Sequence, residues 1–400
     1  MRTVSSLSLI LTWACTNTVP LTVVAQSSAA LPRVHVLRTP DSGIQPQAAV
    51  DDKGTVHLIY FKGEPKGGDL YYVRREPGHM DFSKPIRVNT QPQTATALGT
   101  IRGAQLAVGK NGRVHVVWDG MGEGASHAAH STHNRDSSPA KAPLLYTRLN
   151  DARTAFEPER NVITYAYGLD GGSSVAADSE GNVYVTWHAA QPGSTDDENG
   201  RTVFVVRSTD EGKTFQREAP AISQPTGACA CCGMRAFADS RGDVLALYRT
   251  AYQMTNRDET LLLSRDKGAT FQIAYSHHWH VGICPMSSAS ISENSGEILA
   301  AAETHGRVFF IRFDPETGKV STPISPETQA KHPVAIGNAR GEVLLVWAEG
   351  TGWDKGGSVV WQVYDHKGNP LAVKGRADGL PTWSLPTAFA EPDGNFSIIY

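Results

Sequence analysis

The stretch DSEGNVYVTW at residues 178–187 combines a turn that ends in glycine with a short apolar strand. The same combination recurs six more times along the chain. The other turns are Asp51–Gly54, Gly109–Gly112, Asp239–Gly242, Glu293–Gly296, Asn338–Gly341 and Glu391–Gly394. Glycine, asparagine and aspartate tolerate the positive φ of tight hairpin turns, and the runs that follow are typical of half-buried or buried strands. The sequence therefore predicts seven β-hairpins of one kind.

Further strand-like runs lie between most of these hairpins, for example Leu70–Arg74 and Pro85–Val88. Four strands per repeat is the composition of a propeller blade. We therefore predict an all-β propeller of seven blades, with six blades as the alternative if one hairpin is irregular. The last hairpin ends at Tyr400, so the run Arg33–Arg38 is expected to close the ring by joining it. A β-sandwich would not explain the four-strand period.

The first thirty residues have the composition of an export signal. Arg2 is followed by the apolar run Leu7–Ala14, which is too short to cross a bilayer. We predict a leader at 1–30 and a single propeller domain at 31–400, in a secreted or periplasmic monomer without a transmembrane span. A lipid anchor at Cys15 is the alternative. The chain has 37 basic and 40 acidic residues, and this balance does not indicate a nucleic-acid partner.

Two segments, Ser208–Phe215 and Ser264–Phe271, share the pattern S-x-D-x-G-x-T-F. An aspartate that accepts nearby backbone N–H groups, a glycine and a buried aromatic together lock a β-turn. The pattern resembles the Asp-box, or bacterial neuraminidase repeat, of sialidases and related propellers. The resemblance implies a structural turn between the third and fourth strands of a blade.

The unusual residues concentrate on the rim that carries the second–third loops and the crossings between blades. The resemblance to sialidases implies arginines that hold a carboxylate and acidic residues that transfer protons. The candidate catalytic residues are Arg102, Asp119, Arg235, Arg249, Arg257, Asp258 and Glu303. The sialidase signature Arg-Ile-Pro is absent, and no tyrosine is identifiable as a nucleophile. We expect a carbohydrate ligand and an exo-sialidase-like hydrolase, with a non-catalytic carbohydrate- or protein-binding propeller as the alternative.

A block of sulfur and imidazole side chains sets this chain apart. Two consecutive blade crossings contribute its members, which are Cys229, Cys231, Cys232, His278, His280, Cys284 and Met286. Cysteines of an exported protein most simply form disulfides, and we favour a bridge from Cys284 to one of the other three. Thiolate, imidazole and thioether ligands would also suit copper or zinc, which makes a metal-binding redox propeller a further alternative. A reactive cysteine remains a third interpretation.

Overall fold

The computed structural model describes residues 31–120, 142–169, 171–190, 193–194 and 197–400. Residues 32–400 form one compact unit, and within the described ranges it consists of strands and three short 3-10 turns. The predicted leader and Cys15 lie outside the described residues. In the described part, no helix has the length and apolar character to cross a membrane.

Seven antiparallel sheets follow one another along the chain, and we number them as blades 1 to 7. Blade 1 consists of β2 (Ile44–Val50), β3 (Val56–Glu64), β4 (Gly67–Arg75) and β5 (Ile86–Arg87). Blade 2 consists of β6 (Gln105–Val108), β7 (Val114–Asp119), β8 (Leu144–Arg148) and β9 (Arg160–Asn161). Blade 3 consists of β10 (Ser174–Ala177), β11 (Val183–Ala190), β12 (Arg201–Ser208) and β13 (Ala219–Pro220). Blades 4 and 5 are β14 (Arg235–Ala238), β15 (Val244–Arg249), β16 (Glu259–Ser264), β17 (Gln272–His277); and β18 (Ser290–Asn294), β19 (Glu297–Thr304), β20 (Arg307–Phe313). Blades 6 and 7 are β21 (Lys331–Gly337), β22 (Val343–Glu349), β23 (Gly357–Tyr364), β24 (Pro370–Leu380); and β25 (Thr387–Ala390), β26 (Phe396–Ile399), β1 (Val34–Leu37).

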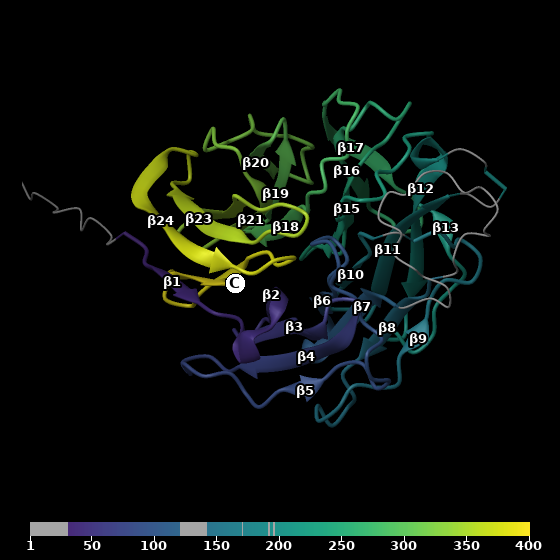
Figure 1. Ribbon diagram of the computed structural model, residues 1–400, viewed down its shortest axis with the longest axis horizontal. Helices are drawn as coiled ribbons and strands as arrows, with labels where there is room; N and C mark the ends of the chain where they lie inside the picture. The colour runs from purple at the N-terminus through teal and green to yellow at the C-terminus, as the bar shows by residue number, and fades with distance from the viewer. Residues whose placement is uncertain (1–30, 121–141, 170, 191–192, 195–196) are drawn as a thin grey trace, which may run out of the picture. The chain divides into compact units, whose positions relative to one another are not determined.

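The sheets are arranged around a common centre (Figure 1). Their innermost strands pack in an unbroken cycle, in which β2, β6, β10, β14, β18, β21 and β25 follow in order and β25 returns to β2. This arrangement confirms the predicted seven-bladed propeller. In blade 7, β1 runs parallel to β26, with Val34 opposite Phe396 and Leu37 opposite Ile399. The N-terminal strand therefore covers an edge of the last hairpin that would otherwise be open.

The seven hairpin turns repeat one local geometry. Their glycines Gly54, Gly112, Gly181, Gly242, Gly296, Gly341 and Gly394 all have positive φ, between 69° and 99°. In several turns the first side chain accepts backbone N–H groups. Asp178 Oδ1, for example, accepts from the N–H groups of Glu180 and Asn182 at 3.0 and 2.9 Å. These turns join the first and second strands of each blade, so they share one end of the ring, which we call the turn end.

The two S-x-D-x-G-x-T-F segments form matching turns between the third and fourth strands of blades 3 and 4. In the first, Asp210 accepts from the backbone N–H and the hydroxyl of Thr214 at 2.9 and 2.7 Å. In the second, Asp266 makes the same two bonds to Thr270 at 2.8 and 2.6 Å. The carboxylates are therefore occupied by their own turns.

The core lies between neighbouring blades. Val117 and Tyr146 of blade 2, for example, pack in one cluster with Trp187 and Phe204 of blade 3. Because every blade depends on the next one for burial, the ring holds the loops at its other end in fixed positions. That other end carries the second–third loops and the blade crossings, and we call it the loop end.

Candidate functional site

The crossing from blade 1 into blade 2 lies over the centre of the ring at the loop end. In this segment, 95–104, the Thr100 hydroxyl contacts His332 Nε2 of blade 6 at 3.2 Å. A Cβ added to Gly171, which leads into blade 3, would lie 2.9 Å from Ile101 Cδ1. A segment that joins blades 1 and 2 can contact both blade 6 and the start of blade 3 only by crossing the centre of the ring. The chain itself therefore covers the centre of the ring at the loop end, on the rim where a carbohydrate ligand was expected.

Of the predicted catalytic residues, Arg102 belongs to this segment and Asp119 lies beside it. Arg102 is half-buried and donates to the carbonyl of Leu98 at 3.0 Å. Asp119 is the last residue of β7 and is 5% exposed, and its Oδ1 accepts the Ser173 hydroxyl at 2.8 Å. Both side chains are held by polar contacts at the centre of the loop end.

Arg235 begins β14, the innermost strand of blade 4. Its guanidinium donates to the carbonyl of Met234 at 3.0 Å, and burial lowers its pKa to about 10. Within the described ranges, no carboxylate forms an ion pair with it. Burial, together with the charges of Lys331 and Arg235, lowers the pKa of His332 to about 3, so this histidine is neutral at pH 7. The centre of the loop end therefore holds the buried guanidinium of Arg235 beside a neutral His332.

Arg249 belongs to a buried ion pair within blade 4, where β15 pairs with β16, rather than to the centre. It is 3% exposed, and its Nη2 lies 3.0 Å from Glu259 Oε2. The same guanidinium donates to the carbonyl of Glu303 and lies 5.2 Å from the centre of the Trp279 ring. Burial raises the pKa of Glu259 to about 7, against the opposing effect of Arg249. Burial likewise raises the pKa of Glu303, which is 2% exposed.

Arg257 and Asp258 are also held by nearby partners. Arg257 Nη1 lies 2.7 Å from Glu198 Oε2. Asp258 accepts the Trp279 backbone N–H at 2.9 Å and contacts His278 Nδ1 at 2.9 Å. The seven predicted catalytic residues thus divide into a central set of Arg102, Asp119 and Arg235, and a set near blades 4 and 5 of Arg249, Arg257, Asp258 and Glu303.

The four described cysteines form one cluster. Cys231 and Cys284 are joined by a disulfide, which confirms the predicted bridge from Cys284 to the earlier cysteines. Cys229 and Cys232 are free and buried. The Cys229 sulfur lies 3.4 Å from Cys232, 3.8 Å from Cys231 and 3.9 Å from Cys284. Cys229 is therefore the sulfur that contacts each of the other three.

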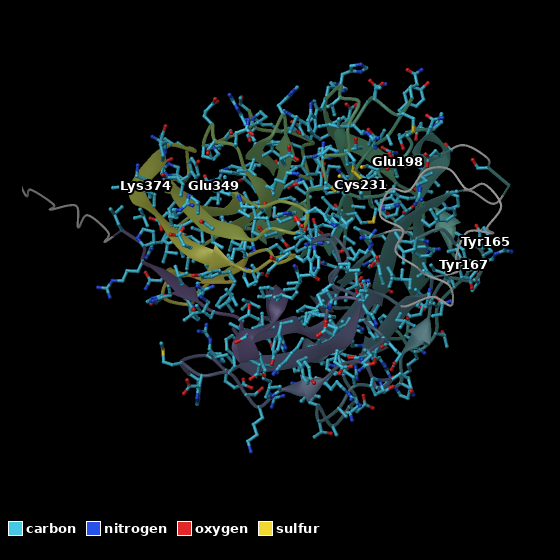
Figure 2. All side chains as sticks on the ribbon, in the orientation of Figure 1. Tyr165, Tyr167, Glu198, Cys231, Glu349 and Lys374 are labelled. Atoms are coloured by element: carbon cyan, nitrogen blue, oxygen red, sulfur yellow. A yellow bond between two sulfur atoms is a disulfide. The ribbon has the colours of Figure 1, made fainter. Side chains whose placement is uncertain are left out.

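Two backbone N–H groups of this cluster donate hydrogen bonds to blade 3 and blade 4 and hold the cluster in place. The Ala230 N–H donates to Glu198 Oε1 at 2.7 Å, and the Cys229 N–H donates to the Arg249 carbonyl at 2.9 Å. Figure 2 shows Glu198 and Cys231 close together at this part of the ring. Burial acts to raise the pKa of Cys232, but the hydrogen bond from Cys229 and the Arg249 charge lower it to about 6. Cys229, as the donor, has a raised pKa.

No protein-family model matches the sequence, and no curated protein is similar enough to match it. Solved structures do share the fold. The α-L-arabinofuranosidase Arb93A from Fusarium graminearum has a TM-score of 0.53 at 13% identity, over 84% of this chain and 98% of that one. The Hadza microbial sialidase Hz136 has a TM-score of 0.50 at 13% identity, over 81% and 70%. A protein of unknown function from Dyadobacter fermentans has a TM-score of 0.50 at 15% identity, over 76% and 94%. At these identities the likeness concerns the fold alone.

The predicted histidine ligands are not part of the sulfur group. In the described part of the chain, the group able to hold a metal ion consists of Cys229, Cys231 and Cys284, with sulfurs within 4.8 Å of one another. Neither His278 nor His280 belongs to it, and both are exposed. Met286 is half-buried on the same crossing as Cys284. Because two of the three sulfurs form the disulfide, the group could bind copper or zinc only after reduction.

Three residues that shape the loop end were given no role of their own by sequence reasoning, although Glu198 and Trp353 lie in stretches that it assigned to the loop-bearing rim. Glu198 and Glu259 are the buried partners of Arg257 and Arg249. A signal was available for Glu259, because it is an acidic residue directly before the apolar run 260–263. Trp353 is 43% exposed on the β22–β23 loop, and a solvent-exposed tryptophan between two apolar strands is itself a signal.

Proposed function

We propose that this chain binds a carbohydrate bearing a carboxylate at the centre of the loop end, on a platform formed by Trp353 and Arg102. The two side chains lie together over Gly99. The Trp353 Cζ3 atom and the Arg102 Nη1 atom lie 3.0 and 3.1 Å from the position that a Cβ on Gly99 would occupy. An exposed indole beside a guanidinium is the observation that carries the proposal.

The platform suits a sugar ring with an acidic group. Trp353 stands at the tip of a tight turn, in which the Gly352 N–H donates to the Lys355 carbonyl at 3.0 Å, so the indole is presented by a fixed backbone. An exposed indole offers a flat apolar face with a polar N–H edge. Arg102 and Arg235 supply positive charge, and a guanidinium can bind both oxygens of a carboxylate. The fold is shared with a sialidase and an arabinofuranosidase, which gives the proposal a precedent by analogy.

Binding is favoured over the exo-sialidase reaction that the sequence suggested. Of the four predicted arginines, Arg249 and Arg257 are each held by a buried glutamate. Removing a buried arginine from its partner costs several kcal/mol, so these two are poor candidates for holding a substrate carboxylate. The proposal therefore assigns no ligand contact to these two arginines and concerns binding alone.

The test measures binding of N-acetylneuraminic acid and of a glucuronic-acid oligosaccharide by titration calorimetry, with a neutral arabino-oligosaccharide for comparison. We expect an acidic sugar to bind more tightly than the neutral one. Trp353→Ala should weaken that binding about tenfold, which corresponds to about 1.4 kcal/mol. The matched control is Ile273→Ala, because Ile273 on the outer strand β17 is 42% exposed, close to the 43% of Trp353.

A second pair of variants tests the charge. Arg235→Gln should weaken binding of the acidic sugar and leave the neutral one unchanged, whereas Arg87→Gln on the outer strand β5 should change neither. Equal affinities of Trp353→Ala and Ile273→Ala would contradict the platform. Absence of binding to any of the three sugars by the wild-type protein would contradict the proposal as a whole.

A further inference from the structure

We propose that the four cysteines form an internal thiol–disulfide exchange centre, in which Cys229 passes the oxidised state between the outer pair Cys231–Cys284 and the inner pair Cys229–Cys232. The proposal is supported by the position of the Cys229 sulfur, which contacts the sulfurs of the other three cysteines. Cys229 lies 3.8 and 3.9 Å from the two disulfide sulfurs and 3.4 Å from Cys232. Exchange proceeds by attack of a thiolate on a disulfide sulfur, and all partners for it are already in contact.

The exchange balances without an external oxidant or reductant. The exchange starts with Cys229 as a thiol and Cys232 as a thiolate, and the Cys229 proton passes to Cys232 along the S–H···S hydrogen bond between them. The Cys229 thiolate attacks Cys284 Sγ, which forms a Cys229–Cys284 bond, breaks the Cys231–Cys284 bond and releases the Cys231 thiolate. Cys232 then gives its proton to Cys231, and its thiolate attacks Cys229 Sγ and releases the Cys284 thiolate. The inner pair has lost two electrons, the outer pair has gained them, and the number of bound protons is unchanged apart from solvent exchange.

The surroundings distinguish the two pairs. Cys229 and Cys232 are 1% and 3% exposed, whereas Cys231 and Cys284 are half-buried. Ile283, the neighbour of Cys284, is 66% exposed. A thiol or disulfide from solvent would therefore meet the outer pair first. The buried pair, beside the Arg249 guanidinium, would store the oxidised or reduced state out of reach of solvent.

The buried position of Arg249 also gives the inner pair a charge environment that a purely structural disulfide does not need. Its guanidinium favours a thiolate at Cys232, which is the attacking sulfur of the second step. The geometry of the cluster carries the proposal without this effect, because the sulfur contacts alone define the sequence of exchange.

The test uses the purified full chain with one disulfide and two thiols among Cys229, Cys231, Cys232 and Cys284, prepared with one equivalent of reductant if these four are isolated as two disulfides. After incubation for a day at pH 7.5 and at pH 8.5, the sample is quenched in acid, alkylated and digested with trypsin. Peptide 218–235 holds three of the cysteines and peptide 268–307 holds Cys284. The outer disulfide links the two peptides, whereas the inner disulfide leaves an internally bridged 218–235 and an alkylated Cys284.

We expect wild-type protein to contain both forms, with at least tenfold more alkylated Cys284 than in Cys229→Ser. The Cys232→Ser variant should instead accumulate the Cys229–Cys284 bond, because the second step is lost. Near-ultraviolet circular dichroism checks that the variants fold, and the wild-type distribution decides the question if they do not. Wild-type protein in which Cys284 stays linked and unalkylated at both pH values would overturn the proposal. Stoichiometric zinc or copper bound to four unpaired cysteines in the protein as purified would also overturn it.

Discussion

The turn end and the loop end of the ring are built from different kinds of contact. At the turn end, each hairpin is held by residues a few positions apart, such as Asp178 and the N–H groups of Glu180 and Asn182. At the loop end, buried ion pairs join side chains farther apart, either on paired strands as in Arg249–Glu259 or in different blades as in Arg257–Glu198. In the first kind of contact a buried turn carboxylate is satisfied by several backbone N–H groups, while the second kind pairs two buried charged side chains with each other.

This difference has an energetic consequence. A charged group at the surface keeps most of its hydration, so losing its partner costs little. A buried charge that loses its partner keeps the full cost of dehydration. The two ends should therefore respond very differently to the same kind of substitution.

The largest effect is expected for Arg249→Met in the loop end. This change leaves Glu259 buried beside a thioether in place of its guanidinium partner, so we expect the free energy of unfolding to fall by about 3–5 kcal/mol. Denaturant unfolding followed by tryptophan fluorescence measures it. The matched change at the turn end is Arg241→Met, where the Arg241 side chain is 36% exposed and its buried partner Asp239 also accepts the backbone N–H groups of Arg241 and Asp243.

The turn-end change should cost less than about 1 kcal/mol. The double variant Arg249→Met with Glu259→Leu should recover most of the lost stability, because it removes both charges together. If Arg249→Met and Arg241→Met cost the same, the contrast between the two ends would be wrong.

An intermediate effect is expected for the S-x-D-x-G-x-T-F turns. Asp210→Ala or Asp266→Ala removes an acceptor from the backbone N–H and hydroxyl of the threonine four residues later. Each should lower the free energy of unfolding by about 1–3 kcal/mol. Asp52→Ala, at an exposed hairpin-turn position, is the control and should cost less than about 0.5 kcal/mol. Sugar binding well below the unfolding temperature should not change, and a loss of binding without a loss of stability would contradict a structural role.

The same contrast explains what could be predicted from the sequence. The hairpins could be predicted from local chemistry, because a glycine at a positive-φ position and an Asx acceptor occur within four residues of each other and are recognisable in the sequence. The number of blades and the pairing partner of the N-terminal strand followed from counting these units. Blade 5 departs from the four-strand expectation, since the segment after β20 contains Pro315, Pro323 and Pro326. Proline cannot donate to a strand ladder, and isolated bridges such as Phe310–Ile324 replace the fourth strand there.

The loop end was predicted less completely, because its contacts depend on which crossings come together. The meeting of Cys284 with the earlier cysteines followed from the order of consecutive blades, but the choice of Cys231 depends on side-chain directions that spacing does not encode. Likewise, nothing near Arg257 in the sequence indicates Glu198 as its partner. The segment 95–104 over the centre was unexpected for the same reason.

The smallest effect concerns pH and the turn-end carboxylates. Hydrogen bonds from threonine lower the pKa of Asp266 to about 2, and in Asp210 such bonds outweigh the effect of burial and give a pKa of about 2 as well. A carboxyl whose pKa is lower in the folded state than the ordinary 3.8 contributes stability above that ordinary value. That contribution is lost as the pH falls from about 4 to about 2, because the unfolded chain binds the protons first. The double variant Asp210→Asn with Asp266→Asn lacks both titrations, so its free energy of unfolding should fall less steeply than that of the wild type across this window. Since both carboxylates are largely solvated, the difference should stay below about 1 kcal/mol per turn. Denaturant unfolding at pH 7, 4, 3 and 2.5 measures it, and parallel curves for the two proteins would show that the turns do not hold ionised carboxylates.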